Sequence, residues 1–333
     1  MIAGIDIGYS HVKFIAPGVV GKFPSAVGNA ERERFSLAGT ETDAVAVDDG
    51  EFLVGNAALL SSRFATRRED RDWINSMHYR VLFAATLTGL TAAKYARLQV
   101  VTGLPVTYLS DRADLVERLR SAWRVRRDGR HWQTVDVTAV AVLPQPFGAL
   151  LDVALDANGK IADATVATGR IGVIDIGGKT TGFLTVDRLR EVPAQTGSID
   201  TGAWDALTLA RDAINTRYPG LELDDYAISA AAQGDSVRYF GDEMDVRNLI
   251  ADALCPLADR VIGEATARWG TGARLDAILV AGGGAHLVGS AILSQYRHAR
   301  IAQSPSKANA LGYYKYGRRL WKQNQKNGTN DSE

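Results

Sequence analysis

The sequence has little of what several common classes of protein require. Cysteine occurs once in 333 residues, at Cys255, so no internal disulfide can form, and the apolar helical pattern around it predicts a small core residue. No apolar run reaches 18 residues without a polar interruption, and no signal peptide precedes the first apolar segment, so we expect a soluble cytoplasmic protein without a membrane span. The 38 basic and 38 acidic side chains cancel, which gives no reason to expect direct binding to nucleic acid.

Motifs of several enzyme classes are also missing. There is no Gly-x-Ser-x-Gly motif for nucleophilic hydrolysis, and the five histidines do not have the spacing of zinc ligands. Gly178-Lys179-Thr180 resembles the end of a P-loop, but the first glycine of that motif would fall on Val173, and a strand follows where a helix is required. Gly282-Gly283-Gly284 begins a dinucleotide-binding motif whose last glycine would fall on Leu287. Both of these interpretations are therefore excluded.

The most informative segment that is present runs from Ile174 to Gly182. Short, β-branched and alternating apolar runs on both sides predict two strands joined by a glycine-rich turn. Glycines can adopt a positive φ and turn their N–H groups inward, which makes such a turn suitable for an anion. Asp175 ends the first strand beside this turn, where a carboxylate can hold a hydrated Mg²⁺.

The same pattern occurs near the start of the chain. Ile5 to Phe14 again predicts a strand, an Asp-Ile-Gly turn and a second strand. Asp6 and Asp175 lie 169 positions apart, about half the chain. A single turn of this kind is most often a plain hairpin. Two matched copies and a third glycine-rich turn favour two related lobes that face each other across a phosphate group.

The length of the chain exceeds what one hydrophobic core usually serves, so two domains are expected. We assign a first lobe to residues 1–170, with a small inserted subdomain at about 28–72. A second lobe follows at 171–305, a helix at 306–321 returns to the first lobe, and we expect a disordered tail at 322–333.

Periodicity and turn residues predict the main elements between these motifs. Helices are predicted at about 73–97 and 148–156, from an N-cap at Ser110 to Arg124, and from a cap near Asp200 or Thr201 to Tyr218. A longer helix is predicted from the apolar stripe at 246–261, with its end at Gly270. Strands are predicted at 98–102, 135–143 and 275–281. The basic run from Arg124 to His131 is predicted to be a solvated turn rather than a nucleic-acid patch. Pro144 and Pro146 fix the backbone around Gln145 and hold its side chain in one direction.

These motifs, in this order, resemble the actin-like ATPase superfamily and, within it, the plasmid-segregation branch of ParM/StbA-type proteins. The resemblance rests on the two Asp-Ile-Gly turns, Pro144-Gln145-Pro146, the triple glycine, Val101 to Pro105 and Ala308 to Tyr314, and it spans residues 2 to about 320. It implies an α/β, actin-like (ribonuclease-H-like) two-lobed fold with the nucleotide in the cleft between the lobes. Its implied cofactors are ATP or GTP, and Mg²⁺.

The resemblance also implies roles for individual residues. Asp6 and Asp175 would hold the metal through water, and Gln145 would orient the attacking water, which makes these three the candidate catalytic residues. The implied nucleotide-binding residues are Gly8, Tyr9, Ser10, His11 and Lys13 in the first lobe, and Gly177, Gly178, Lys179, Thr180, Thr181, Asp200, Gly202, Gly282, Gly283, Gly284 and Ala285 in the second.

Two residues depart from the family pattern. Tyr9 stands where actin has a small serine, which puts a direct hydroxyl contact with phosphate in question. Lys179 stands in place of a third glycine, and two readings are open: strain at a positive φ, or an added cation beside the γ-phosphate.

The resemblance implies an ATPase that polymerises into nucleotide-dependent filaments for plasmid DNA segregation. Its partners would be copies of itself and a DNA-binding adaptor protein at a centromere-like site, with no membrane contact. A small-molecule kinase of the sugar-kinase type is the alternative on the same architecture, but no second-lobe carboxylate is placed to act as its base. A DnaK-type chaperone would need a peptide-binding domain, and a membrane-tethered division protein an amphipathic terminal helix, which 322–333 does not provide.

Overall fold

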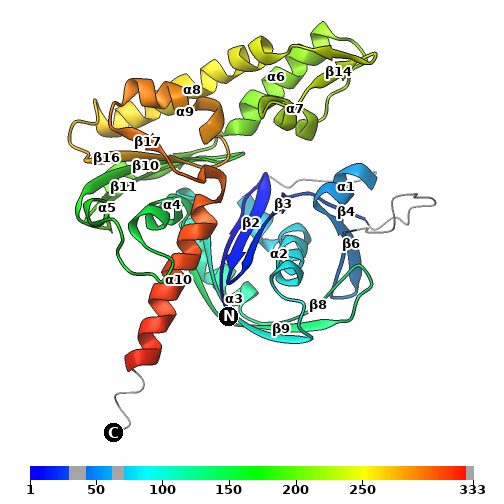
Figure 1. The fold of residues 1–333 in the computed structure, drawn as a ribbon, viewed down its shortest axis with the longest axis vertical. Coiled ribbons are helices and arrows are strands. Elements are labelled where there is room, and N and C mark those ends of the chain that lie inside the picture. The colour runs from blue at the N-terminus through cyan, green and yellow to red at the C-terminus, as the bar shows by residue number, and fades with distance from the viewer. Residues whose placement is uncertain (30–42, 62–70, 328–333) are drawn as a thin grey trace. The chain divides into compact units, whose positions relative to one another are not determined.

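The computed structural model describes residues 1–29, 43–61 and 71–327 and divides into two compact units (Figure 1). The first comprises residues 1–164 and 307–333, and the second comprises residues 165–306. The fold is mixed α/β, with parallel strands at the centre of each main sheet.

The first unit is built on a nine-stranded sheet with the strand order β3-β2-β1-β7-β9-β8-β5-β6-β4. Its strands are β1 (Ile2–Ile7), β2 (His11–Ala16), β3 (Val19–Pro24), β4 (Val27–Asn29), β5 (Ala44–Val47), β6 (Gly50–Val54), β7 (Tyr95–Leu104), β8 (Ala122–Arg127) and β9 (Gln133–Pro144). The described parts of 28–72, which we expected to form an inserted subdomain, thus extend this same sheet, because β5 pairs with β8. Residues 30–42 and 62–70 of that segment lie outside the described residues.

Helices cover both faces of this sheet. They are α1 (Gly55–Ser61), α2 (Met77–Leu90), α3 (Arg112–Leu119), α4 (Gln145–Ala154) and α10 (Ala308–Asn327), with short 3₁₀ turns at Arg71–Asn75, Val106–Asp111 and Pro305–Lys307. Helix α2 is apolar on almost every side and lies inside the curve of the sheet (Figure 1), so its side chains form the centre of the core.

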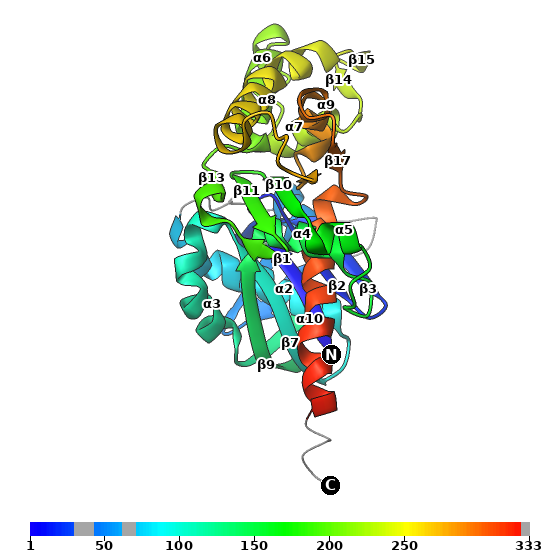
Figure 2. The same cartoon turned by 90° about the vertical axis from the view of Figure 1, so that its left-hand side faces the viewer.

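Helix α10 runs beside α4 and β1 in both views (Figures 1 and 2). The contact is close because glycines face backbone. A Cβ added to Gly312 would lie 1.8 Å from the carbonyl oxygen of Gly148, and one added to Gly4 would lie 2.2 Å from that of Ala310. The helix continues to Asn327, six residues past its predicted end, and residues 328–333 of the predicted tail lie outside the described residues.

The second unit repeats the start of the first. Its sheet has the order β12-β11-β10-β16-β17, with β13 beside β11, and β14 and β15 form a separate hairpin. The strands are β10 (Arg170–Ile176), β11 (Thr181–Asp187), β12 (Arg190–Glu191), β13 (Gly197–Ile199), β14 (Val237–Tyr239), β15 (Asp242–Met244), β16 (Ala277–Ala281) and β17 (Ala299–Ile301). The helices are α5 (Ala164–Thr168) at the division, α6 (Ala203–Arg217), α7 (Asp225–Ala232), α8 (Arg247–Trp269) and α9 (Ala285–Gln295), with a 3₁₀ turn at Pro193–Gln195.

The predicted apolar stripe of α8 is confirmed, since Ile250, Leu257 and Val261 are buried, and the helix ends at Gly270 with φ 59°. Cys255 on the same helix is exposed, so the prediction of a core cysteine was wrong. The apolar residues near Cys255 in the sequence, such as Leu257 and Ala258, lie on a different, buried face of α8.

Two predicted boundaries in the first unit were also wrong. Helix α2 ends at Leu90 because the Gln133 side chain donates to the carbonyl oxygens of Thr91 and Ala93, at 2.8 and 3.2 Å, and holds that loop out of the helix. The strand that follows begins at Tyr95.

The helix predicted from Ser110 to Arg124 is shorter, and Ser110 does not cap it. Helix α3 begins at Arg112 after a 3₁₀ turn, and the Ser110 hydroxyl donates to the carboxylate of Asp111 instead. The basic run after it is mainly the strand β8, in which Trp123 and Val125 point into the core between charged neighbours. The basic run is therefore a strand as far as Arg127, and the predicted turn is confined to Asp128 and Gly129.

Candidate functional site

The two aspartate turns have the same backbone pairing. Asp6 lies opposite Lys13 across β1 and β2, and Asp175 lies opposite Gly182 across β10 and β11. In the first turn the N–H of Gly8 donates to the carbonyl oxygen of His11 at 3.1 Å; in the second, Gly177 donates to Thr180 at 2.9 Å. Each antiparallel pair also continues into a parallel neighbour, β7 or β16. The repeat inferred from sequence is therefore a repeat of structure.

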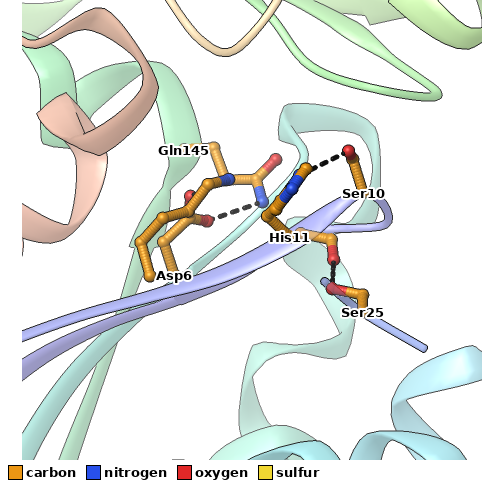
Figure 3. Close-up of polar contacts among 7 residues, drawn as sticks. Asp6, Ser10, His11, Ser25 and Gln145 are labelled. Carbon is orange, nitrogen blue, oxygen red and sulfur yellow. Dashed lines mark hydrogen bonds and ion pairs between the residues drawn. The ribbon is translucent and has the colours of Figure 1, made fainter. Parts of the chain in front are cut away.

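The first turn places a buried carboxylate beside a cation and an amide. The Asp6 residue is 4% exposed, and its Oδ2 lies 3.2 Å from Lys13 Nζ. Gln145 is the first residue of α4, and its Nε2 donates to Asp6 Oδ1 at 3.4 Å (Figure 3). The structure thus brings together three of the residues singled out from sequence, although they are up to 139 positions apart.

The carbonyl groups of the first turn are held by a residue that the sequence analysis missed. Ser25, which follows β3, donates from its hydroxyl to Gly8 O at 2.6 Å (Figure 3). Its N–H donates to Ser10 O at 2.9 Å. His78 at the start of α2 is buried, and its Nε2 lies 3.0 Å from Ser25 O, so it donates in the tautomer that carries the proton there. No local pattern marks either residue, because the contacts span 17 and 53 positions.

Loss of the Ser25 hydroxyl should destabilise the first unit. In Ser25→Ala, the half-buried carbonyl of Gly8 loses this donor, which should cost about 1 kcal/mol, near the lower end of the range for such groups. Urea unfolding should show a lower midpoint with an unchanged slope. Ser294→Ala is the matched control, because the Ser294 hydroxyl makes an exposed bond to Ser290 O and its loss should change little. Equal stabilities of the two variants would contradict this role.

Other side chains at the first turn are fixed by neighbours. Tyr9 is buried and stacks on Trp73 with ring centroids 4.7 Å apart, so its side chain belongs to the core, and its backbone is the part that can reach a ligand. The Ser10 hydroxyl and His11 Nδ1 lie 2.7 Å apart (Figure 3).

The electrostatic environment of the first turn suits an anion. Lys22 lies opposite Lys13 across β2 and β3. Partial burial, followed by the positive charges of Lys13 and Lys307, lowers the pKa of Lys22 from its ordinary value. The ammonium groups of Lys13, Lys22 and Lys307 therefore lie in one region. Of these, Lys13 pairs with the carboxylate of Asp6. A bound anion would relieve this repulsion.

The carbonyl groups of the second turn are held by a helix. Gly177 O and Gly178 O accept bonds of 2.9 Å from the N–H groups of Ala203 and Trp204, which begin α6. Gly202 permits this approach, since a Cβ there would lie 2.3 Å from Gly178 O. Its predicted role as a ligand remains a prediction, but its packing alone requires glycine.

The triple glycine lies against the end of β10. Gly282 has φ 87°, and a Cβ on it would lie 2.2 Å from Ile176 O and 2.6 Å from Asp175 Oδ1. The N–H of Gly284 donates to Ile176 O at 2.9 Å. The glycine-rich turn after Asp175 and the triple glycine are thus adjacent within the second unit. The carboxylate of Asp175, a residue that is 6% exposed, lies beside both.

The structure removes one of the two readings of Lys179. This residue is not among the described residues with a positive φ, so the reading of backbone strain was wrong. It is half-buried beside Thr180, and the reading of an added cation remains for functional test.

Metal-binding clusters and membrane-spanning helices are both absent from the described residues. Within residues 1–29, 43–61 and 71–327, no three His, Cys, Asp or Glu side chains gather as a metal site would require. Among the described helices, none has the length and apolar character needed to cross a membrane.

Comparison with known proteins agrees with this geometry. Residues 4–148 match the family profile described as "Actin like proteins N terminal domain". Residues 173–294 match the profile "Archaeal actin homologue MreB-like, C-terminal". The chain is an actin-like protein. A search of curated protein sequences gives no significant match.

Solved structures of actin-like proteins share the whole fold. The "pCBH ParM non-polymerisable quadruple mutant" has a TM-score of 0.80 at 21% identity, covering 96% of this chain and 99% of that one. A 15-stranded ParM filament from Clostridium botulinum has a TM-score of 0.80 at 22% identity with the same coverage. Ta0583, an archaeal actin homolog solved in complex with ADP, has a TM-score of 0.76 at 20% identity, again with the same coverage. The predicted actin-like, two-lobed fold is therefore confirmed.

Proposed function

We propose that this actin-like protein is an ATPase of the plasmid-segregation type, which binds Mg²⁺–nucleotide through its repeated aspartate turns and assembles into filaments. The observation that carries the proposal is the repeated aspartate turn. Each copy has a buried carboxylate at the end of a strand and a loop whose carbonyl oxygens are bound from behind, by Ser25 or by the start of α6. A loop held in this way directs N–H groups toward an anion.

The residues present suit a hydrated Mg²⁺. This ion keeps several water ligands and commonly uses one or two carboxylates together with the phosphates of a nucleotide. Asp6 and Asp175 provide one carboxylate in each unit, which matches that need without a cluster of protein ligands. The metal would neutralise charge on the phosphates. The chain itself would supply Lys13 and the loop amides as further positive groups.

Gln145 is the group proposed to position the attacking water. Phosphoryl transfer to water depends mainly on positioning and on neutralisation of charge. The Gln145 amide is tied to the metal-side carboxylate Asp6 by a bond of 3.4 Å, which is long and therefore weak. It can exchange this partner for a water molecule without disrupting α4. The triple glycine and Asp200 are assigned to the nucleoside side.

Filament assembly is the proposed output, and its proposed role is to move plasmid DNA through a DNA-binding adaptor. Two structural relatives are named as ParM proteins, and one of these was solved as a filament. A head-to-tail contact between identical subunits extends without limit when its rotation does not close a ring. Binding of a nucleotide with a γ-phosphate can drive such assembly, because one charged group makes several charge-assisted contacts.

Light scattering of the purified protein tests this function. With ATP and Mg²⁺, scattering should rise above a threshold protein concentration and fall as the nucleotide is consumed, and a parallel series with GTP identifies the preferred base. A non-hydrolysable analogue should give filaments that persist, which electron microscopy would show. A protein that binds nucleotide but stays monomeric at tens of micromolar with every nucleotide, and that phosphorylates a sugar, would favour the kinase alternative.

A further inference from the structure

The β14–β15 hairpin of the second unit ends in an aromatic side chain that folding does not require. Phe240 is 92% exposed, the largest exposed fraction among the described large hydrophobic residues. It occupies the first of two loop positions, since Tyr239 pairs with Asp242. Phe240 and Gly241 have φ values of 52° and 94°. Such two-residue turns favour Asn, Asp or Gly at the first position, and a bulky residue with a positive φ is an outlier.

The exposed ring is held in place from below. Tyr239 packs against Phe240 with ring centroids 4.5 Å apart, and Tyr218 packs against Tyr239 at 5.5 Å. The Tyr239 hydroxyl donates to Pro219 O at 2.9 Å, and Val237 is buried among side chains of α6 and α7. The three rings therefore form a supported aromatic ladder. A rigid aromatic group that loses little conformational freedom on binding is typical of the centre of a protein interface.

The surroundings of this ladder are acidic. Residues 235–247 contain four carboxylates and two arginines. Arg247 pairs with Asp245 at 2.6 Å and Arg238 lies 4.0 Å from Glu243, which leaves Asp235 and the exposed Asp242 as carboxylates with no ion pair among the described residues. A partner that accepts Phe240 should therefore present positive charge, because like charges across an interface are costly. It should also offer an aromatic or apolar surface for the ring.

The first unit carries a surface of that chemistry. Residues 122–131, which include β8, contain four arginines and one aspartate. Arg124 and Arg126 lie over the ring of Trp132, with distances of 4.3 and 5.0 Å from their guanidinium carbons to the ring centroid. Arg126 also pairs with Glu51 at 3.3 Å, whereas Arg124 is exposed and forms no ion pair within the described part of the chain. We call Arg124, Arg126 and Trp132 the arginine edge.

We propose that the Phe240 tip of one copy binds the arginine edge of another copy of this chain. The occupant is a second copy because the tip and the edge are complementary in charge and both are aromatic, and because the contact is heterologous, as a growing polymer requires. The inference rests on the proposed filament function and adds the residues that make one of its contacts.

Phe240→Asn is the sharpest single test. Asparagine suits the turn better than phenylalanine does, so the variant should fold at least as stably as the wild type, with the same nucleotide-dependent rise in melting temperature. The threshold concentration for assembly, measured by light scattering and pelleting, should rise about tenfold or more, as for loss of a central aromatic contact. Leu209→Ala is the matched control, because Leu209 is 54% exposed on α6 of the same unit and lies outside the hairpin.

Charge reversal and cross-linking identify the partner surface. Asp242→Lys should weaken assembly, and adding Arg124→Glu to the same chain should restore most of the loss. In a Cys255→Ser background, which removes the exposed native thiol, Asp242→Cys and His131→Cys proteins are mixed, because these exposed positions adjoin Phe240 and Trp132 and leave both rings in place. Only the mixture should yield a disulfide-linked dimer with nucleotide under mild oxidation.

The outcomes separate the two proposals. A Phe240→Asn protein that assembles at the wild-type threshold, or an equal loss for Leu209→Ala, overturns the contact and leaves the filament function standing. Loss of assembly without rescue by Arg124→Glu and without the mixed dimer overturns the arginine edge as the partner. A wild-type protein that never assembles overturns both proposals.

Discussion

Replacing Asp175 with asparagine should abolish most of the stabilisation that ATP and Mg²⁺ give to this protein. A ligand present at a thousand times its Kd stabilises the folded state by about 4 kcal/mol, which should raise the melting temperature by several degrees. The variant keeps the shape of the side chain beside Gly282 but loses the charge proposed to hold the hydrated metal. Thermal unfolding with and without ATP and Mg²⁺ measures the difference.

Asp187→Asn is the control for this substitution. Asp187 lies at the end of β11, the strand paired with β10, and its side chain is 46% exposed. The control should keep the full nucleotide-dependent shift. A similar shift in Asp175→Asn would show that the carboxylate is misassigned, and a wild-type protein that no nucleotide stabilises would contradict the proposed function as a whole.

Removing the Gln145 side chain should slow hydrolysis much more than it weakens binding. Loss of a group that positions water or handles its proton commonly lowers the rate by roughly 10²–10⁴, and an amide that only orients water belongs at the lower end. The amide makes one weak bond in the first unit, so Gln145→Ala should fold normally and bind nucleotide within a few fold of the wild type. Phosphate release and equilibrium affinity are the two measurements.

Filaments of Gln145→Ala should also persist after those of the wild type have disassembled. Gln233→Ala is the matched control, because Gln233 is an exposed amide at the end of α7 whose bonds are local. If affinity collapses while the rate per bound nucleotide is unchanged, Gln145 is a binding residue and the proposed role is wrong.

The parts that the sequence predicts well are those encoded by neighbouring residues. The turns after Asp6 and Asp175 are visible because strand alternation and glycine occur within ten positions. The apolar stripe of α8 is visible because it repeats every 3.6 residues. The Pro144-Gln145-Pro146 segment marked a residue that the fold does bring to Asp6.

The parts that sequence misses depend on distant contacts. Ser25 and His78 support the first turn through bonds that no local pattern encodes. The strand β8 was taken for a turn because its arginines hide the alternation of Trp123 and Val125. The end of α2 is set by Gln133, more than forty positions away. Tertiary contacts override local propensity at each of these places.

The division of the chain has a consequence for how the protein is made. The second unit is one continuous segment, residues 165–306, whereas the first requires residues 307–333 for completion. A ribosome releases the N-terminal part first, so the nascent chain carries the face of β1 and α4 without α10 until the whole second unit and residues 308–327 have been made. Gly4 and Gly148, which lie under α10 in the finished protein, are uncovered throughout that interval. Helix α10, which follows the whole second unit in the chain, therefore packs onto a face that β1 and α4 form much earlier in the sequence.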